Sequence, residues 1–233
     1  METQSAPDCP QSGDYYMSLD CCRLKVKEYN CGTIEVFDIS SIPLLEGNDS
    51  AAKYTGPAIL KVYSTTETPE ADGIATKDEQ NSRALLVAKA EREVDALSAL
   101  NKKGCEYVPK LLAHWIESTG DIESEDSSTD GSPCNAATDS SLKHYILMTK
   151  VPGITLESKF DWLPRDEKVQ KTDAFRIAIA SVQECGVDNG SAHLGNVIWS
   201  EQENKCYIID FERATYKRHK FGSTYPDDWG MLW

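Results

Sequence analysis

Near the C-terminal end, two short apolar runs separated by a polar turn restrict the fold more than any other stretch. Val197–Trp199 and Cys206–Ile209 flank Ser200–Lys205, and this pattern is typical of a β-hairpin. Asn196 stands directly before the first run and Asp210 directly after the second. Antiparallel pairing places the two side chains at the same end of the hairpin, where they offer the hard oxygen ligands that Mg²⁺ accepts. An ordinary surface hairpin with two polar ends remains the alternative.

The composition narrows the classes of function. The chain has 233 residues, 40% of them hydrophobic, and a formal net charge of −14. This is enough to build a core, but the acidity argues against nucleic-acid binding and against an anionic membrane surface. Eight cysteines occur without a C-x-x-C pair or zinc-like histidine spacing. Residues 1–14 lack the features of a secretory signal, and no apolar run has the length of a membrane span. We therefore expect a cytoplasmic protein with free thiols, no membrane partner and no nucleic-acid partner.

The N-terminal half predicts a hairpin followed by a strand that contains a lysine. Leu24–Tyr29 and Ile34–Ile39 alternate apolar and polar residues on either side of a short turn. Pro57–Tyr63 has the composition of a buried strand that is interrupted by Lys61. Burying an unpaired lysine is costly. Lys61 therefore either has an anionic partner or lies on an edge strand and reaches solvent.

A helix is predicted from about Ser82 to Leu100, and it supplies a partner for the lysine. Its apolar residues recur at helical spacing, at Leu86, Ala90, Val94, Leu97 and Leu100. Glu93 falls inside this apolar arc, whereas Glu91 falls on the polar side. We assign an ion pair between Lys61 and Glu93, with a solvated boundary position for Glu93 as the alternative. A second helix is predicted over Asp173–Cys185.

The order of these features resembles the protein-kinase-like fold. The features are A-I-L-K ending at Lys61, the helix with Glu93, a hinge-like V-P-G, N-V-I-W from Asn196 and I-I-D-F-E around Asp210. The D-F-E form resembles small fungal kinase-like proteins and relatives of the aminoglycoside phosphotransferases. The resemblance implies an α+β, two-lobed fold, with a mainly antiparallel N-lobe sheet plus one helix and then a shortened helical C-lobe.

The same resemblance implies roles for individual residues. Lys61 and Glu93 would order the phosphates of ATP, and Asn196 and Asp210 would hold Mg²⁺. Backbone groups of the interlobe hinge would contact the adenine, and these belong to Met148, Thr149, Lys150 and Val151. In the family, a glycine-rich loop between the first two strands covers the phosphates. Here that turn contains only Gly32, so it is a weak match.

The catalytic loop departs from the family pattern, which reads H-x-D-x-x-x-x-N. Counting back from Asn196, the aspartate position is Ser191 and the histidine position is Asn189. The aspartate orients or deprotonates the attacking hydroxyl, and a serine cannot act as a base near pH 7. Asp188 and His193 lie nearby in the sequence and are candidates to replace it.

The predicted organisation is one kinase-like domain after a polar N-terminal segment. Residues 1–20 are expected to be disordered, and the domain spans 21–233, with an N-lobe over 21–149 and a C-lobe over 150–233. An acidic insert over 117–140 has too few apolar residues to fold alone. Only a short segment follows the D-F-E motif, and a truncated gene model, a minimal lobe and a degenerate relative all remain open as explanations.

These observations favour an ATP- and Mg²⁺-binding kinase-like domain whose phosphoryl transfer is weak or absent, that is, a pseudokinase. Its partner would be a nucleotide, and a protein partner remains open. One alternative is an active phosphotransferase that acts on a protein Ser/Thr or on a small-molecule hydroxyl. A second alternative is an interaction scaffold without a ligand.

Overall fold

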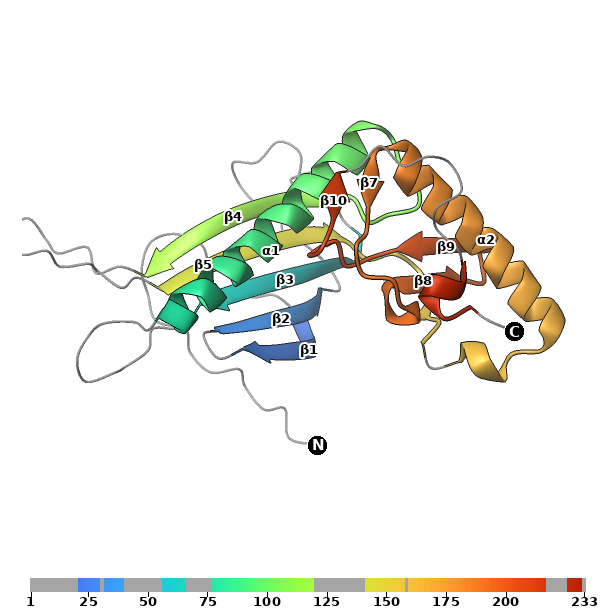
Figure 1. Ribbon diagram of the computed structural model, residues 1–233, viewed down its shortest axis with the longest axis horizontal. Helices are drawn as coiled ribbons and strands as arrows, with labels where there is room; N and C mark the ends of the chain where they lie inside the picture. The colour runs from blue at the N-terminus through green and yellow to red at the C-terminus, as the bar shows by residue number, and fades with distance from the viewer. Residues whose placement is uncertain are drawn as a thin grey trace, which may run out of the picture.

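The computed structural model describes residues 21–29, 32–39, 56–65, 77–119, 141–157, 159–216 and 226–231. In these residues the chain forms two lobes that are joined after residue 149 (Figure 1). The predicted fold class is therefore confirmed: an antiparallel sheet with one helix comes first, and a small lobe with one long helix follows. Within the described residues, no helix is both long enough and apolar enough to cross a membrane.

The N-terminal lobe is built on a five-stranded antiparallel sheet with the order β1-β2-β3-β5-β4. The strands are β1 (Cys21–Tyr29), β2 (Gly32–Ile39), β3 (Ala58–Thr65), β4 (Leu111–Thr119) and β5 (Ser141–Thr149). The predicted hairpin is formed by β1 and β2. Because β3 lies between β2 and β5, the edge-strand alternative for Lys61 is wrong.

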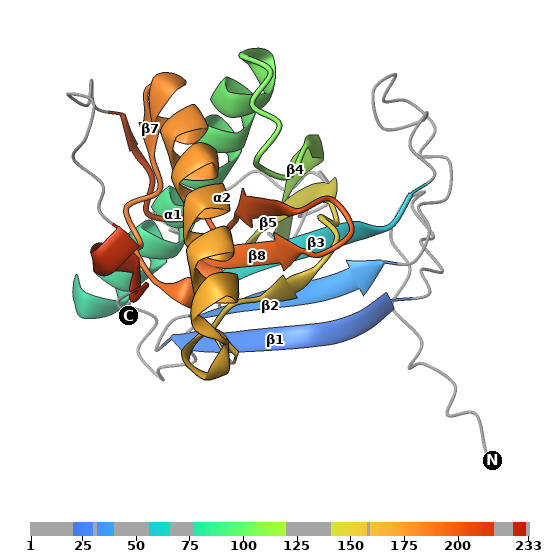
Figure 2. The ribbon, with the colours of Figure 1, turned by 90° about the vertical axis from the view of Figure 1, so that its right-hand side faces the viewer.

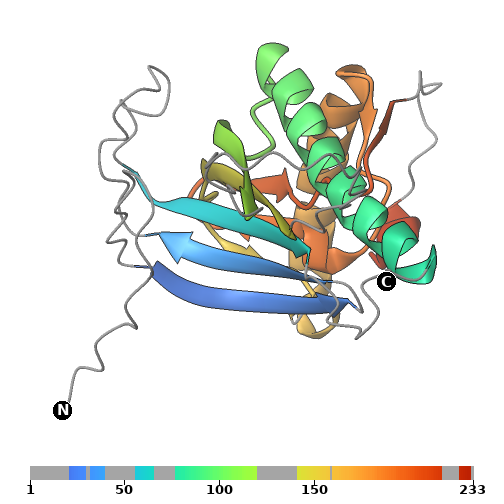
Figure 3. The ribbon, with the colours of Figure 1, turned by 90° about the vertical axis from the view of Figure 1, so that its left-hand side faces the viewer.

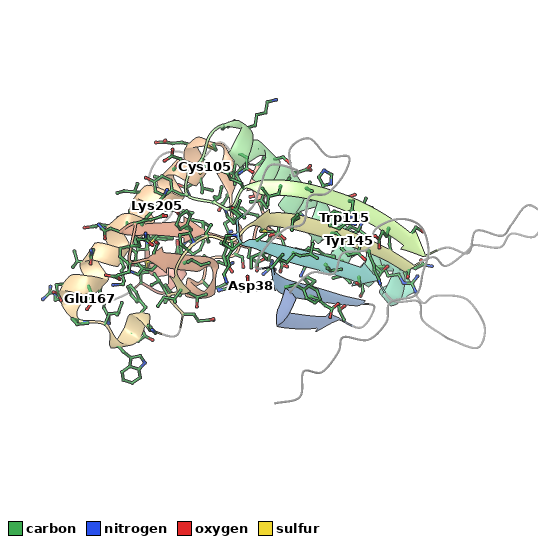
Figure 4. The ribbon with its side chains drawn as sticks, turned by 180° about the vertical axis from the view of Figure 1, so that it is seen from behind. Asp38, Cys105, Trp115, Tyr145, Glu167 and Lys205 are labelled. Carbon is green, nitrogen blue, oxygen red and sulfur yellow. The ribbon has the colours of Figure 1, made fainter. Side chains whose placement is uncertain are left out.

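The residues of β3 are nearly all buried. Helix α1 (Lys77–Lys102) crosses one face of the sheet (Figures 1 and 3). The opposite face carries a second apolar cluster that includes Leu60, Val62 and Leu147. There the rings of Trp115 and Tyr145 stack with their centroids 4.9 Å apart (Figure 4). A charged side chain on β3 that faces α1 is consequently removed from water.

The C-terminal lobe packs α2 (Arg165–Glu184) against short strands (Figure 2). Three of the strands form one sheet in the order β6-β8-β9, and the other two pair with each other. Their bounds are Ile154–Thr155 for β6, Val187–Asp188 for β7, Val197–Ser200 for β8, Lys205–Ile208 for β9 and Thr215–Tyr216 for β10. Phe160, Phe175 and Phe211 are fully buried in this lobe, and Trp229 packs on the ring of Phe175.

The predicted C-terminal hairpin is confirmed as β8 and β9, with Val197 opposite Ile208 and Ser200 opposite Lys205. A neighbouring strand, β6, pairs with β8 directly after Gly153. Gly153 has φ +121°, and a Cβ there would lie 2.1 Å from the backbone oxygen of Trp199. This close approach requires glycine and fixes how the interlobe connection joins the hairpin.

Three predicted boundaries are wrong. In each case the missed residues are mostly polar and lack the apolar periodicity from which the element was predicted. Helix α1 begins at Lys77 rather than near Ser82, and α2 begins at Arg165 rather than Asp173. Strand β4 continues through Glu117–Thr119, inside the insert that was predicted to be disordered. Pairing with β5 and a hydrogen bond from the Tyr145 hydroxyl to Glu117 Oε2 (2.8 Å) stabilise that extension. The predictions for residues 1–20 and 120–140, and for the turn at Asn30 and Cys31, lie outside the described residues.

Candidate functional site

The site centres on the side chain of Lys61, which joins both lobes. Lys61 Nζ lies 2.6 Å from Glu93 Oε2 on α1 and 2.6 Å from Asp210 Oδ1, directly beyond the β8–β9 hairpin. The predicted ion pair with Glu93 is therefore present, and the contact with Asp210 is an addition that the sequence did not indicate. Tyr63 donates its hydroxyl hydrogen to the same Glu93 oxygen at 2.5 Å. We call these four residues the Lys61 cluster.

Two charges of the Lys61 cluster, those of Lys61 and Glu93, are buried. Lys61 is 6% exposed and Glu93 is 1% exposed, so neither charge is solvated and each depends on its partners. Burial alone lowers the pKa of Lys61, but the charge of Glu93, followed by Tyr63 and Asp210, raises this pKa well above its usual value. Burial, and then the charge of Glu93, also raises the pKa of Tyr63. The lysine is thus held as a cation and the tyrosine as a neutral hydroxyl.

Asp210 is held in an unusual backbone conformation. Its φ is +63°, in the left-handed region that residues other than glycine adopt at a cost of roughly 1–2 kcal/mol. Asn189, which is fully buried, donates from Nδ2 to the carbonyl oxygens of Ile209 (3.0 Å) and Asp210 (3.1 Å). The Ile209 N–H donates to Asn196 O at 3.0 Å. These bonds and the Lys61 ion pair together fix the Asp210 carboxylate in place.

Asn196 and Asp210 lie at the same end of the hairpin, as the sequence predicted. Asn196 is 2% exposed and donates from Nδ2 to Ser191 O at 3.0 Å, which leaves its Oδ1 as an acceptor. A carboxylate accepts several bonds, so the Lys61 contact leaves Asp210 with capacity for a metal. An amide oxygen and one carboxylate suit Mg²⁺, which completes its shell with water and phosphate oxygens. The described residues contain no cluster of three or more His, Cys, Asp or Glu that could hold a metal by themselves.

The Gly186–Asn196 loop keeps a defined shape without a carboxylate at the base position. Ser191 occupies that position, and its N–H donates to Asn189 Oδ1 at 3.2 Å. Gly190 has φ +70°, and a Cβ there would lie 2.1 Å from the backbone oxygen of Arg213. The loop is therefore pressed against the chain that follows Asp210.

The two candidate replacements for the missing base differ in environment. Asp188 is half-buried in β7, where it pairs with Thr215 of β10, and its Oδ1 accepts a hydrogen bond from the Gly190 N–H at 3.4 Å. His193 is exposed to solvent. Asp188 is thus engaged with the loop backbone, and His193 lies at the surface.

A second ion pair joins α1 to the D-F-E segment, and the sequence did not indicate it. Lys89 Nζ lies 3.4 Å from Glu212 Oε1, and the two side chains are only 12% and 8% exposed. Lys89 precedes Glu93 by one helical turn. The only available signal was the glutamate that follows Asp210-Phe211, because its partner is an ordinary helix lysine in the sequence.

The hinge residues line a cavity of about 750 Å³. Its walls are formed by Asn101, Gly104, Cys105, Glu106, Val108, Lys110, Leu111, Leu112, Thr149, Lys150, Val151, Pro152 and Tyr207. Lys61 and Asp210 are absent from this lining, so the cavity is distinct from the Lys61 cluster. The backbone N–H groups of Thr149 and Lys150 already donate to Lys110 O and Pro57 O. Adenine contact by Met148–Val151 stays a prediction.

Comparisons with known proteins add little to this geometry. No protein-family model matches the chain, and no curated protein matches it. A solved structure, the WbdD protein co-crystallised with the kinase inhibitor LY294002, is similar at 14% identity with a TM-score of 0.44. The similarity covers 82% of this chain, which spans about a third (32%) of that chain.

Proposed function

We propose that the chain binds Mg²⁺·ATP between its two lobes and transfers the γ-phosphoryl group weakly or not at all. The observation that carries the proposal is the Lys61 cluster. It brings a cation from β3, a carboxylate from α1 and a carboxylate beyond the hairpin together, although Glu93 and Asp210 are 32 and 149 residues from Lys61 in sequence. Two buried charges and the half-buried Asp210 meet at the junction of two lobes, and such a group is a candidate site with a physical rationale.

In this proposal each side chain has a definite task. The Lys61 ammonium would contact phosphate oxygens, while Glu93 and Tyr63 keep it oriented. Asn196 Oδ1 and the Asp210 carboxylate would hold Mg²⁺, which when bound neutralises phosphate charge. Asn189 would maintain the left-handed backbone that aims Asp210 at this position. These groups bind and orient the nucleotide without moving a proton.

Weak transfer follows from the group at the base position. A positioned general base contributes typically 10²–10⁴-fold to a rate, and Ser191 has only a hydroxyl. The hydrogen bond from Asn196 to Ser191 O shows that the loop keeps its shape. In this proposal the missing element is the proton acceptor. We therefore expect ATP binding to be retained while phosphoryl transfer is weak or absent.

Calorimetric titration with ATP, with and without Mg²⁺, tests the binding step. The wild type should bind in a Mg²⁺-dependent manner, and Asp210→Asn should lose that dependence because a charged metal ligand is removed. Asp228→Asn is the matched control, since Asp228 is exposed. If the folded wild type binds no nucleotide under either condition, the proposal is wrong and the scaffold alternative is favoured.

The Ser191→Asp variant tests the assignment of the missing base. ATP turnover should increase by at least about 10²-fold if the base is the only part that is lacking. Ser191→Asn is the control, because it has a similar size without a carboxylate. A wild type that already turns over ATP as fast as Ser191→Asp would support the active phosphotransferase instead.

A further inference from the structure

The C-terminal ends of the two long helices meet on the far side of the molecule from the β1–β2 edge (Figure 1). Lys103, directly after α1, donates from Nζ to the carbonyl oxygen of Cys185, which is the C-cap of α2 (2.7 Å). The Cys105 N–H donates to Leu100 O at 3.0 Å, which folds the chain back beneath the last turn of α1. Figure 4 shows Cys105 at this junction. Each lobe therefore contributes one cysteine to the same small region.

Cys105 and Cys185 both adjoin Ser181 on α2. Cys105 Sγ lies 3.5 Å from the hydroxyl oxygen of Ser181 on α2. Cys185 follows Ser181 by four residues, and its N–H donates to Ser181 O at 3.3 Å, so the two side chains share one face of the helix. Burial, then the nearby Cys105 thiol, raises the pKa of Cys185, while Lys103 opposes the shift.

Access to the pair is available from solvent. Cys105 is 6% exposed, and it lines the 750 Å³ cavity behind the hinge. Cys185 is half-buried. Both are free thiols, as is Cys206. Cys206 is different because it is fully buried, its Sγ donates to Lys171 O at 3.6 Å, and burial raises its pKa to about 12.

We propose that Cys105 and Cys185 form a thiol modification site, at which a small-molecule disulfide such as glutathione disulfide converts the pair into a disulfide that joins the two lobes. The more exposed Cys185, as its thiolate, attacks one sulfur of glutathione disulfide and releases one glutathione thiolate. Cys105 then attacks the Cys185 sulfur of the mixed disulfide and releases the second glutathione. Two protein thiols are oxidised, one glutathione disulfide is reduced, and two protons pass to the two glutathiones.

The position of the crosslink determines its consequence. Cys105 directly follows the helix that carries Glu93, and Cys185 directly precedes the Gly186–Asn196 loop. The disulfide would close a segment of 80 residues, the difference between 185 and 105. Closing a loop of this length limits the unfolded chain, and the oxidised protein should melt about 10 °C higher than the reduced protein. The proposal holds whether or not the site binds a nucleotide.

The test is titration of the full chain with glutathione disulfide, followed by alkylation and non-reducing peptide mapping. Wild-type protein should give a linked Cys105–Cys185 peptide, and the reaction should be faster at pH 9 than at pH 7 because more Cys185 is thiolate. Cys105→Ser should stop at a glutathione adduct on Cys185. Cys206→Ser should form the same crosslink as the wild type.

Two outcomes of the peptide mapping would overturn the proposal. One is a folded, fully titrated wild type whose Cys105 and Cys185 are both alkylated as free thiols. The other is a crosslink that persists in Cys185→Ala, since this would show that Cys105 pairs with a different cysteine. Thermal unfolding with and without dithiothreitol supplies an independent readout, and an equal melting temperature for the crosslinked and reduced forms would contradict the assigned link between the lobes.

Discussion

The Lys61 cluster contains Asp210, and the Gly186–Asn196 loop lies against the chain that follows it, but different kinds of group hold the two regions together. The cluster combines one cation and two carboxylates at 2.6 Å. The loop makes equally regular contacts through the amide groups of Asn189 and Asn196, and a serine stands at position 191. The loop therefore keeps its shape without a charged side chain at that position.

The difference has a physical origin. In the cluster, the Lys61 cation itself joins Glu93 to Asp210, so its loss would leave the buried Glu93 carboxylate without a cation from this pair. In the loop, the contacts that fix the shape come from amide side chains and the backbone. The group at position 191 contributes only its backbone to those contacts, and its side chain can therefore change without cost to the fold.

The largest expected effect is that of Lys61→Met, which leaves the buried Glu93 and the half-buried Asp210 without the Lys61 ammonium. The variant should lose about 3 to 5 kcal/mol in the free energy of unfolding, measured by urea denaturation. The double variant Lys61→Met/Glu93→Gln should recover much of this stability, because the neutral amide can still accept from Tyr63. Equal stability of the single and double variants would show that the buried charge is not the cause.

Asn189→Ala should have the next largest effect and extend the comparison into the loop. It removes three hydrogen bonds: the carbonyl groups of Ile209 and Asp210 lose this donor, and the Ser191 N–H loses its acceptor. We expect a loss of about 2 kcal/mol, together with weaker Mg²⁺-dependent ATP binding because Asp210 relaxes from its left-handed conformation. His193→Ala, in the same loop but exposed, is the control and should change neither measurement.

The Lys89–Glu212 ion pair tests whether a second charged contact, besides that of Lys61, links α1 to the D-F-E segment. A double-mutant cycle with Lys89→Met and Glu212→Gln should give a coupling energy of about 1 kcal/mol, since the pair is mostly buried but its separation of 3.4 Å is long. The cycle isolates this pair from the other contacts of both residues. A coupling energy of zero would show that Lys61 alone links α1 to the D-F-E segment.

The smallest expected effect concerns His144, which lies opposite Tyr63 in the sheet. Burial lowers the pKa of His144 below its usual value of 6.5, although Glu91 opposes and His114 reinforces the shift. As the pH falls below about 6.5, the unfolded chain therefore binds this proton before the folded protein does, and stability decreases toward the folded pKa. His144→Phe should flatten the curve of unfolding free energy between pH 7 and pH 5. An unchanged slope would assign the pH dependence to another group.

The sequence alone determined the features that rest on local pattern. Short apolar runs on either side of a turn located the β1–β2 and β8–β9 hairpins, and helical spacing placed Glu93 on the apolar side of the helix and Glu91 on the polar side. Both inferences were possible because apolar residues on a buried face recur at regular intervals in the sequence. The sequence also predicted the Lys61–Glu93 ion pair and the position of Asn196 and Asp210 at one end of the hairpin. The first turns of α1 and α2 were missed, since their mostly polar residues show no apolar periodicity.

Only the tertiary structure decided what Asp210 contacts and how its backbone is held. The left-handed conformation depends on Asn189, and the ion pairs of Lys61 with Asp210 and of Lys89 with Glu212 join segments from different lobes. The spacing of these residues along the sequence does not indicate how far apart they lie in space. That distance is set by how the sheet, α1 and the hairpin pack together. Local sequence patterns therefore identified the candidate charged residues, and packing between the lobes decided which of them lie in contact.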